Sequence, residues 1–163
     1  MTSRYGTTAR TAARAPVRTA AAIVGGVFLL VGILGFIPGI TTHYDTMHAA
    51  GHQSGAMLLG VFQVSVLHNI VHLLFGIAGL AMSRTIPAAR TYLIAGGVIY
   101  GILWLYGLII DQTSPANIVP VNSADNWLHL LLAIGMIALG VGLTRNRRDD
   151  LARTRDDEVA YRR

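Results

Sequence analysis

The chain carries one short pattern twice, as His68-Asn69-Ile70-Val71-His72-Leu73-Leu74 and as Asp125-Asn126-Trp127-Leu128-His129-Leu130-Leu131. Both copies share the core Asn-x-x-His-Leu-Leu and continue into small and aliphatic residues at 76–81 and 133–138. A weaker match pairs the Gly-Gly-Val at 25–27 with the one at 96–98. Internal similarity of this kind is typical of duplicated helical units in membrane proteins.

The spacing of the matches predicts how the copies are arranged. The earlier pair of segments is offset by about 71 residues and the later pair by about 57, so about 14 extra residues lie between the first two segments. We expect two copies of a helical hairpin, related as parallel repeats by a pseudo-two-fold axis along the membrane normal. The alternative is that two leucine-rich segments resemble each other through composition alone.

Composition places the chain in a membrane. Of its 163 residues, 53% are hydrophobic and 13% are charged, against about 25% charged in a soluble domain. Mean hydropathy is +0.52. Between Thr19 and Thr144 the only charged residues are Asp45, Arg84, Arg90, Asp111 and Asp125. A soluble globule, a disordered chain and, because there is no cysteine, a disulfide scaffold are excluded.

Four stretches are long and apolar enough to cross about 30 Å of hydrocarbon, which takes about 20 residues of helix. They cover residues 17–37, 64–82, 91–110 and 126–143. Helices are expected because lipid offers the backbone no hydrogen-bond partners. The predicted fold is therefore an all-α bundle of four transmembrane helices in one domain, with a basic tail at 1–16 and a charged tail at 144–163.

The arginines predict the orientation. Four lie before or at the very start of the first span, two lie between the second and third, and seven follow the fourth, whereas residues 38–63 and 111–125 contain none. The positive-inside rule then places both termini in the cytoplasm. Basic charge beside spans orients the protein and meets anionic lipid headgroups. No nucleic-acid-binding motif accompanies it, so we expect the lipid bilayer and not nucleic acid as the partner. An oligomer or a membrane-protein partner stays open.

Polar side chains recur on one face of two spans, because residues four apart share a helix face. His68 and His72 lie on the second span, and Asp125 and His129 are their counterparts on the fourth. Asn69 and Asn126 flank them. Polar groups at membrane depth almost always face the bundle interior, so the sequence predicts a buried cluster near the outer mouth.

Three roles are open for this cluster. It is a structural plug if the side chains hydrogen-bond one another and hold the hairpins together. It is a cofactor site if His72 and His129 ligate a haem, or if His68, His72, His129 and Asp125 bind a divalent metal. It handles protons or a small solute if the imidazoles titrate. The plug without a cofactor is favoured, because an H-x-x-x-H pair lacking a general-base Glu is a weak motif.

Other features predict packing and not catalysis. No nucleophile elbow, cysteine nucleophile or phosphate-binding glycine loop occurs, so we expect no enzymatic activity. The Gly97/Gly101 pair is interpreted as packing inside the bundle in preference to homodimerisation. In the first outer connection, His43, His48 and His52 offer a loose metal site. The favoured alternative is a partly helical loop whose residues 57–62 lie on the membrane surface.

Residues 64–76 and 119–129 also resemble signatures of a family of small bacterial multi-pass membrane proteins, frequent in actinobacteria, catalogued as a domain of unknown function. The resemblance covers about residues 18–143. It implies four spans in a bacterial inner membrane. It implies no activity, substrate or cofactor, so every site residue above rests on its position in the chain.

Overall fold

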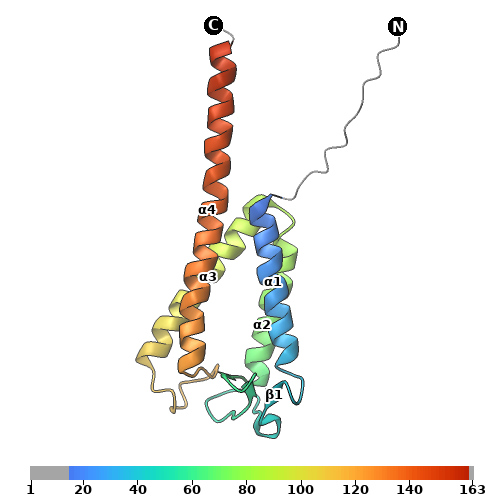
Figure 1. The fold of residues 1–163 in the computed structure, drawn as a ribbon. Coiled ribbons are helices and arrows are strands. Elements are labelled where there is room, and N and C mark those ends of the chain that lie inside the picture. The colour runs from blue at the N-terminus through green and yellow to red at the C-terminus, as the bar shows by residue number, and fades with distance from the viewer. Residues whose placement is uncertain (1–14, 162–163) are drawn as a thin grey trace, which may run out of the picture.

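The computed structural model describes residues 15–161, with side chains up to residue 144. Within that part, four α-helices make up most of the chain (Figure 1): α1 Pro16–Leu34, α2 Val66–Met82, α3 Ile86–Ile109 and α4 Ser123–Tyr161. Three of them are long and apolar enough to span a membrane, namely α1, α3 and the Ser123–Thr144 part of α4. α2 is apolar but shorter, with 17 residues.

Local chemistry accounts for where the helices begin. Ser65 precedes α2 and its Oγ accepts a hydrogen bond from the backbone N–H of His68, and Thr85 caps α3 in the same way through the N–H of Ala88. Hydroxyl side chains are preferred at this position because they satisfy an N–H that the helix leaves free. Prolines occupy the first turns of α1 and α3, where no N–H is needed.

Several helix ends differ from the bounds of the predicted spans. α1 ends at Leu34 and not at 37, since the residue before Pro38 disfavours helical backbone. α3 begins at Ile86, five residues before the predicted start of 91, because its cap is Thr85. α4 continues without interruption from the apolar segment into the charged tail and ends at Tyr161. The predicted N-terminal tail at 1–16 lies almost wholly outside the described residues.

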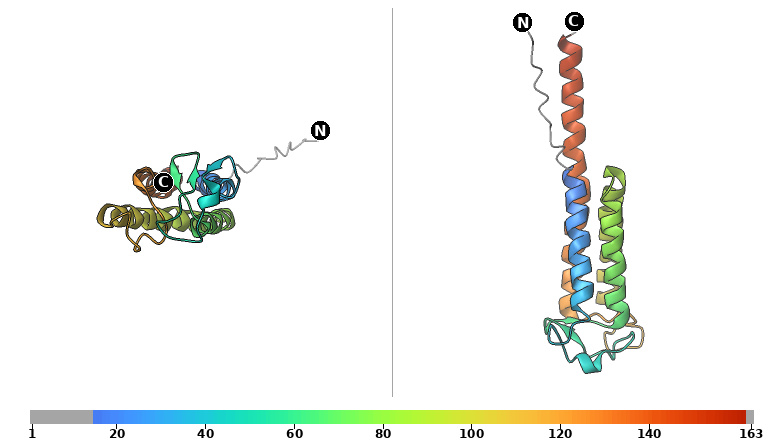
Figure 2. Two further views of the ribbon diagram at one scale, coloured as in Figure 1. Left: turned by 90° about the horizontal axis from the view of Figure 1, so that it is seen from below. Right: turned by 90° about the vertical axis from the view of Figure 1, so that its right-hand side faces the viewer.

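The connection between α1 and α2 is partly helical, as predicted, through the 3-10 helix η1 Tyr44–Thr46, and it also contains a small sheet that was not predicted. Strands β1 Thr41–Thr42, β2 Met57–Leu58 and β3 Phe62–Gln63 pair antiparallel in the order β1-β2-β3. A tight turn joins β2 to β3, and Leu59 and Gly60 both have positive φ there, at 54° and 70°. Such turns match the twist of a hairpin. Figure 2 shows the strands gathered with the loops at one end of the helices. We call this part, residues 35–65 and 110–122, the loop cap.

The helices pack chiefly in two pairs, α1 with α2 and α3 with α4. Small residues allow both close approaches. A Cβ built on Gly25 would lie 3.0 Å from the carbonyl oxygen of Gly76 and 2.9 Å from the backbone nitrogen of Leu80. A Cβ built on Gly97 would lie 2.9 Å from the carbonyl oxygen of Ala133 and 3.1 Å from the backbone nitrogen of Ile137. Gly97 therefore serves packing inside the bundle.

These two contacts correspond residue by residue. Gly25 and Gly97 differ by 72 positions (97 − 25), and Gly76 and Ala133 differ by 57 (133 − 76). The same shifts relate Leu80 to Ile137. The offset between α1 and α3 is thus 72 and not the predicted 71, because the structure aligns Gly25 with the second glycine of the Gly96-Gly97 pair.

Apolar side chains from all four helices form the interior. Its buried members include Val17 and Phe28 on α1, Leu93 and Tyr100 on α3, and Met136 on α4, with Phe75 of α2 packed against them. A separate small cluster lies in the loop cap around Ala56, Leu58 and Val64. The outward apolar side chains, such as Ile77 and Leu131, remain more than half exposed, as expected for surfaces that contact lipid.

Candidate functional site: a buried polar core

All six polar residues singled out in the sequence are buried. They come from the ends of α2 and α4 nearest the loop cap, and their exposed fractions range from 1% at Asn69 to 8% at His72. Buried polar groups require partners, because an unmet hydrogen bond costs about 1–3 kcal/mol. We call this set the polar core: His68, Asn69, His72, Asp125, Asn126 and His129.

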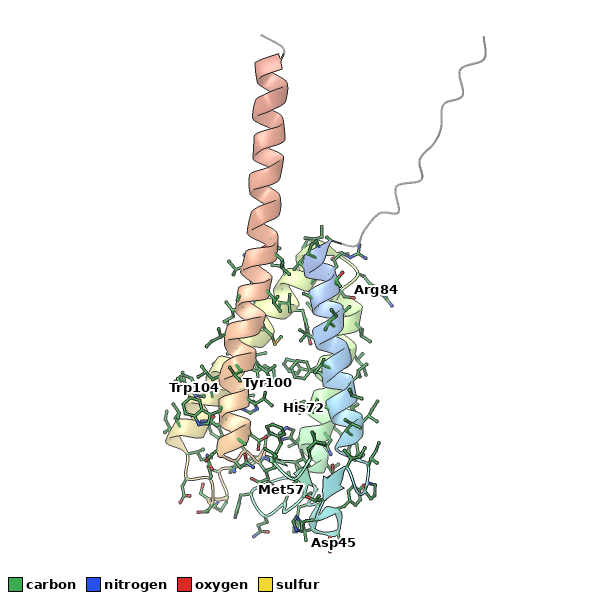
Figure 3. All side chains as sticks on the ribbon, viewed as in Figure 1. Asp45, Met57, His72, Arg84, Tyr100 and Trp104 are labelled. Carbon is green, nitrogen blue, oxygen red and sulfur yellow. The ribbon has the colours of Figure 1, made fainter. Side chains whose placement is uncertain are left out.

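Two aromatic rings that the sequence analysis missed connect the histidines. Phe28 of α1 lies 5.5 Å from the ring of His72, and Tyr100 of α3 lies 5.3 Å from the ring of His129, measured between centroids. Phe28 and Tyr100 stack on each other at 5.4 Å with only 6° between their planes. Figure 3 shows His72 and Tyr100 in the middle of the molecule, between the two helix pairs.

The contacts between aromatic rings and histidines are related by the same two sequence shifts as the glycine contacts. Phe28 and Tyr100 differ by 72 positions (100 − 28), and His72 and His129 differ by 57 (129 − 72). Each histidine therefore meets the aromatic residue of its own helix pair, and the two aromatic residues meet at the centre. This equivalence was the signal available in the sequence, at the third residue after Gly25 and after Gly97.

The histidines of α2 donate hydrogen bonds to backbone carbonyls. Nδ1 of His72 lies 3.0 Å from the carbonyl oxygen of His68, and Nδ1 of His68 lies 3.2 Å from the carbonyl oxygen of Pro120. A carbonyl only accepts, so Nδ1 carries the proton in both rings. The two rings stack at 4.6 Å. The bond to Pro120 connects α2 to the loop that precedes α4.

Asp125 makes the reciprocal connection. Its Oδ2 accepts hydrogen bonds of 3.0 Å from the backbone N–H of Gln63, in β3, and from that of Asn122. In return, Oδ1 of Asn122 accepts from the N–H of Asp125 at 2.9 Å. This is the reciprocal pattern of a helix capping box. Asp125 therefore both begins α4 and holds the loop cap.

The asparagines of the polar core pack onto glycines, one directly after α1 and one in α3. A Cβ added at Gly35 would overlap the amide group of Asn69, and one added at Gly107 would overlap that of Asn126. Gly35 and Gly107 again differ by 72 positions (107 − 35). Each asparagine thus fits against a place where the facing helix has no side chain.

Not every polar atom has a protein partner. Among the described side chains, Nδ2 of Asn69, Oδ1 of Asn126 and Nδ1 of His129 are buried without a hydrogen bond. His129 differs in this respect from its counterpart His72, whose Nδ1 is bonded. The two copies of the polar core are therefore similar in packing and different in hydrogen bonding.

The arrangement gives little support to a metal site. Within the described part of the chain, no three or more His, Cys, Asp and Glu side chains are grouped so that they could hold a metal ion. This applies to the set His68, His72, His129 and Asp125, and also to the loop histidines 43, 48 and 52. For a haem between His72 and His129, each imidazole already has an aromatic ring packed beside it, Phe28 or Tyr100.

The described fold is that of a mostly helical protein with three helices long and apolar enough to span a membrane, which suggests a membrane protein. The chain belongs to the DUF4383 family, a domain of unknown function, whose model matches residues 18–142. The match covers all four apolar helical segments and the loop cap. Neither the curated proteins nor the solved structures gave a match.

Proposed function

We propose that this chain is a non-enzymatic integral membrane protein that crosses the bilayer four times, with the polar core as a structural plug between two hairpins. That α2 crosses the membrane has to be proposed, because its 17 residues give only about 25 Å of helix. Its length is close to the hydrocarbon thickness, and helices slightly too short are accommodated by local thinning. The arginine distribution supports cytoplasmic termini.

The hairpins α1–α2 and α3–α4 are proposed to be duplicated copies. Glycine approach, aromatic–histidine contact and asparagine–glycine packing all recur at the same two shifts, 72 between α1 and α3 and 57 between α2 and α4. Similar composition alone does not produce three kinds of contact in one register. The longer first connection then accounts for the difference between the shifts, and it supplies the strands of the loop cap.

One observation carries the plug: hydrogen bonds of two different kinds, made by side chains at corresponding positions, cross between the two hairpins in both directions. His68 of the first hairpin reaches Pro120 of the second, and Asp125 of the second reaches Gln63 of the first. The residues of the two bonds correspond through the shift of 57, which relates His68 to Asp125 and Gln63 to Pro120. Polar contacts between membrane helices are typically worth about 0.6–2 kcal/mol each, so this reciprocal pair holds the hairpins in register.

The plug is tested by comparing two equivalent histidines. His72→Leu removes a formed hydrogen bond, whereas His129→Leu removes an Nδ1 that has no protein partner. Both lose contact with one aromatic ring. We expect His72→Leu to lower the melting temperature in detergent by about 2–4 °C for each 1 kcal/mol lost, and His129→Leu to lower it less. Matched controls are the lipid-facing variants Leu74→Ala and Leu131→Ala, whose side chains are 59% and 67% exposed.

The outcomes separate the alternatives. The hydrogen bond of His72 lies within α2, so the plug itself is tested at His68: an unchanged melting temperature in His68→Leu, which lacks the bond to Pro120, rules out the plug. An absorption spectrum of the purified wild-type protein with a Soret band, lost in His72→Leu, establishes the haem alternative. We expect neither.

A second role, binding of a small polar molecule, is favoured by the three unpartnered atoms of Asn69, Asn126 and His129. A molecule bonded to Nδ1 of His129 would supply the hydrogen-bond partner that the protein does not. In that case His129→Leu costs as much stability as His72→Leu, and the same comparison distinguishes the two roles.

A further inference from the structure

An apolar groove lies between α2 and α3 in the half of the molecule away from the loop cap. Its volume is about 330 Å³, and its walls are formed by residues from Leu74 to Met82 on α2 and from Thr91 to Ile99 on α3. Eight residues of helix span about 12 Å. One leaflet of the hydrocarbon core is about 15 Å deep, so the groove matches one leaflet in length.

Two arginines are close in the sequence to the groove residues at one end. Arg84, in the turn after α2, follows Met82 by two residues, and Arg90 on α3 directly precedes Thr91. Both are exposed, and Nε of Arg90 donates to Oγ1 of Thr144 at 3.3 Å. Figure 3 shows Arg84 at the end of the bundle opposite the loop cap. No acidic residue occurs between positions 46 and 110, so nothing in α2 or α3 neutralises this end.

We propose that the groove binds one anionic phospholipid of the cytoplasmic leaflet. The acyl chain lies between α2 and α3, and the phosphate lies beside Arg84 and Arg90. A purely apolar occupant, such as a partner helix, would match the walls and leave the cationic end without a counterpart, whereas an anionic lipid matches both. The proposal rests on the membrane placement given above.

The test is native mass spectrometry of the detergent-purified protein mixed with phosphatidylglycerol or with phosphatidylcholine of the same acyl chains. We expect the wild type to retain phosphatidylglycerol preferentially. Each basic residue near anionic headgroups contributes about fivefold to binding, so Arg84→Gln/Arg90→Gln should weaken retention by about 25-fold. The control Arg153→Gln/Arg155→Gln removes the same charge from the C-terminal part of α4 and should leave retention unchanged.

A second pair of variants tests the groove itself. Ala95 lines it, whereas Val98 on the same helix is 49% exposed and lies outside it. Ala95→Phe should displace the lipid and Val98→Phe should not, with melting temperatures confirming that both are folded. Equal retention of the two lipids, or retention indifferent to Arg84→Gln/Arg90→Gln and to Ala95→Phe, overturns the proposal. That failure leaves the four-span placement untouched, because the side of the membrane on which each loop lies is measured separately.

Discussion

At the scale of single residues, the polar core depends on glycines that it faces. Asn69 and Asn126 are 1% and 5% exposed, and each occupies the space that a Cβ on Gly35 or Gly107 would take. An amide of this size can be buried between helices only where the facing residue has no side chain, because protein interiors have no spare volume. The glycine and the asparagine therefore form one unit.

This unit predicts a rescue. Gly35→Ala should destabilise the protein by about 1–3 kcal/mol through overpacking, and Asn69→Ala in the same chain should recover part of that loss by removing the overlapped amide. The measurement is a double-mutant cycle on melting temperatures in detergent. Gly26→Ala is the control, since a Cβ there meets nothing within 4 Å. If the effects of Gly35→Ala and Asn69→Ala on the melting temperature are additive, the two residues do not act as one packing unit.

The sequence predicted the polar members of the core and missed the residues that surround them. His68, His72 and His129 stand out because polar residues are rare in an apolar segment. Phe28 and Tyr100 do not, because an aromatic residue in such a segment is ordinary. Their contact depends on how α1 and α3 are rotated and shifted against each other, and that is set by side-chain packing between helices distant in the chain.

At the scale of the elements, the loop cap and the helices are joined at Asp125. Its carboxyl group accepts from Gln63 of β3 and from Asn122, so one buried side chain begins α4 and secures the third strand. Asn122 also donates from Nδ2 to the carbonyl oxygen of Val61 at 2.8 Å. The sequence analysis considered Asp125 as a metal ligand, whereas its hydrogen bonds are those of a helix cap.

Replacing Asp125 should therefore loosen the cap more than the helix bundle. In Asp125→Ala we expect amide exchange at Gln63 and Asn122 to accelerate by about tenfold or more, since hydrogen bonds to charged groups contribute about 1.5–3 kcal/mol. Amides in the middle of α1 and α3 should be less affected. Asp111→Ala is the matched control, because among the described residues Oδ1 of Asp111 accepts from Thr113, two residues away. Equal acceleration throughout the bundle would show that Asp125 supports the whole fold.

The strands of the cap illustrate what a hydropathy pattern cannot predict. Residues 57–63 are apolar enough for a surface helix or for strands, and segments this short give no clear period. The turn decides, through positive φ at Leu59 and Gly60. Leucine seldom adopts this conformation, so the residues themselves carried no turn signal beyond Gly60. The helices were predictable because their apolar segments are long.

At the scale of the whole molecule, the structure has two helix pairs with one loop cap. α1 begins and α4 ends toward the same end of the molecule, and the strands lie at the other (Figure 1). Two arginine hydrogen bonds occur at that first end, from Arg18 to Ser83 and from Arg90 to Thr144. Arg18 of α1 and Arg90 of α3 correspond through the shift of 72 positions. This placement of basic residues at one end and the cap at the other agrees with the proposed four spans and internal termini.

Cysteine labelling decides between four spans and three. The chain has no cysteine of its own, so single variants report one position each. If α2 crosses the membrane, Asp45→Cys and Thr113→Cys should both react with an impermeant maleimide in intact cells, and Ser83→Cys and Arg155→Cys should react only after permeabilisation. If only the three long helices cross, the first connection and the α2–α3 turn share one side. Thr113→Cys is then protected, while Ser83→Cys and Arg155→Cys become accessible together with Asp45→Cys.

Three of the four positions change between the two topologies, so a single poorly reactive site cannot produce the wrong answer. The three-span result would remove α2 from the membrane and, with it, the lipid-facing surroundings on which the proposed plug depends.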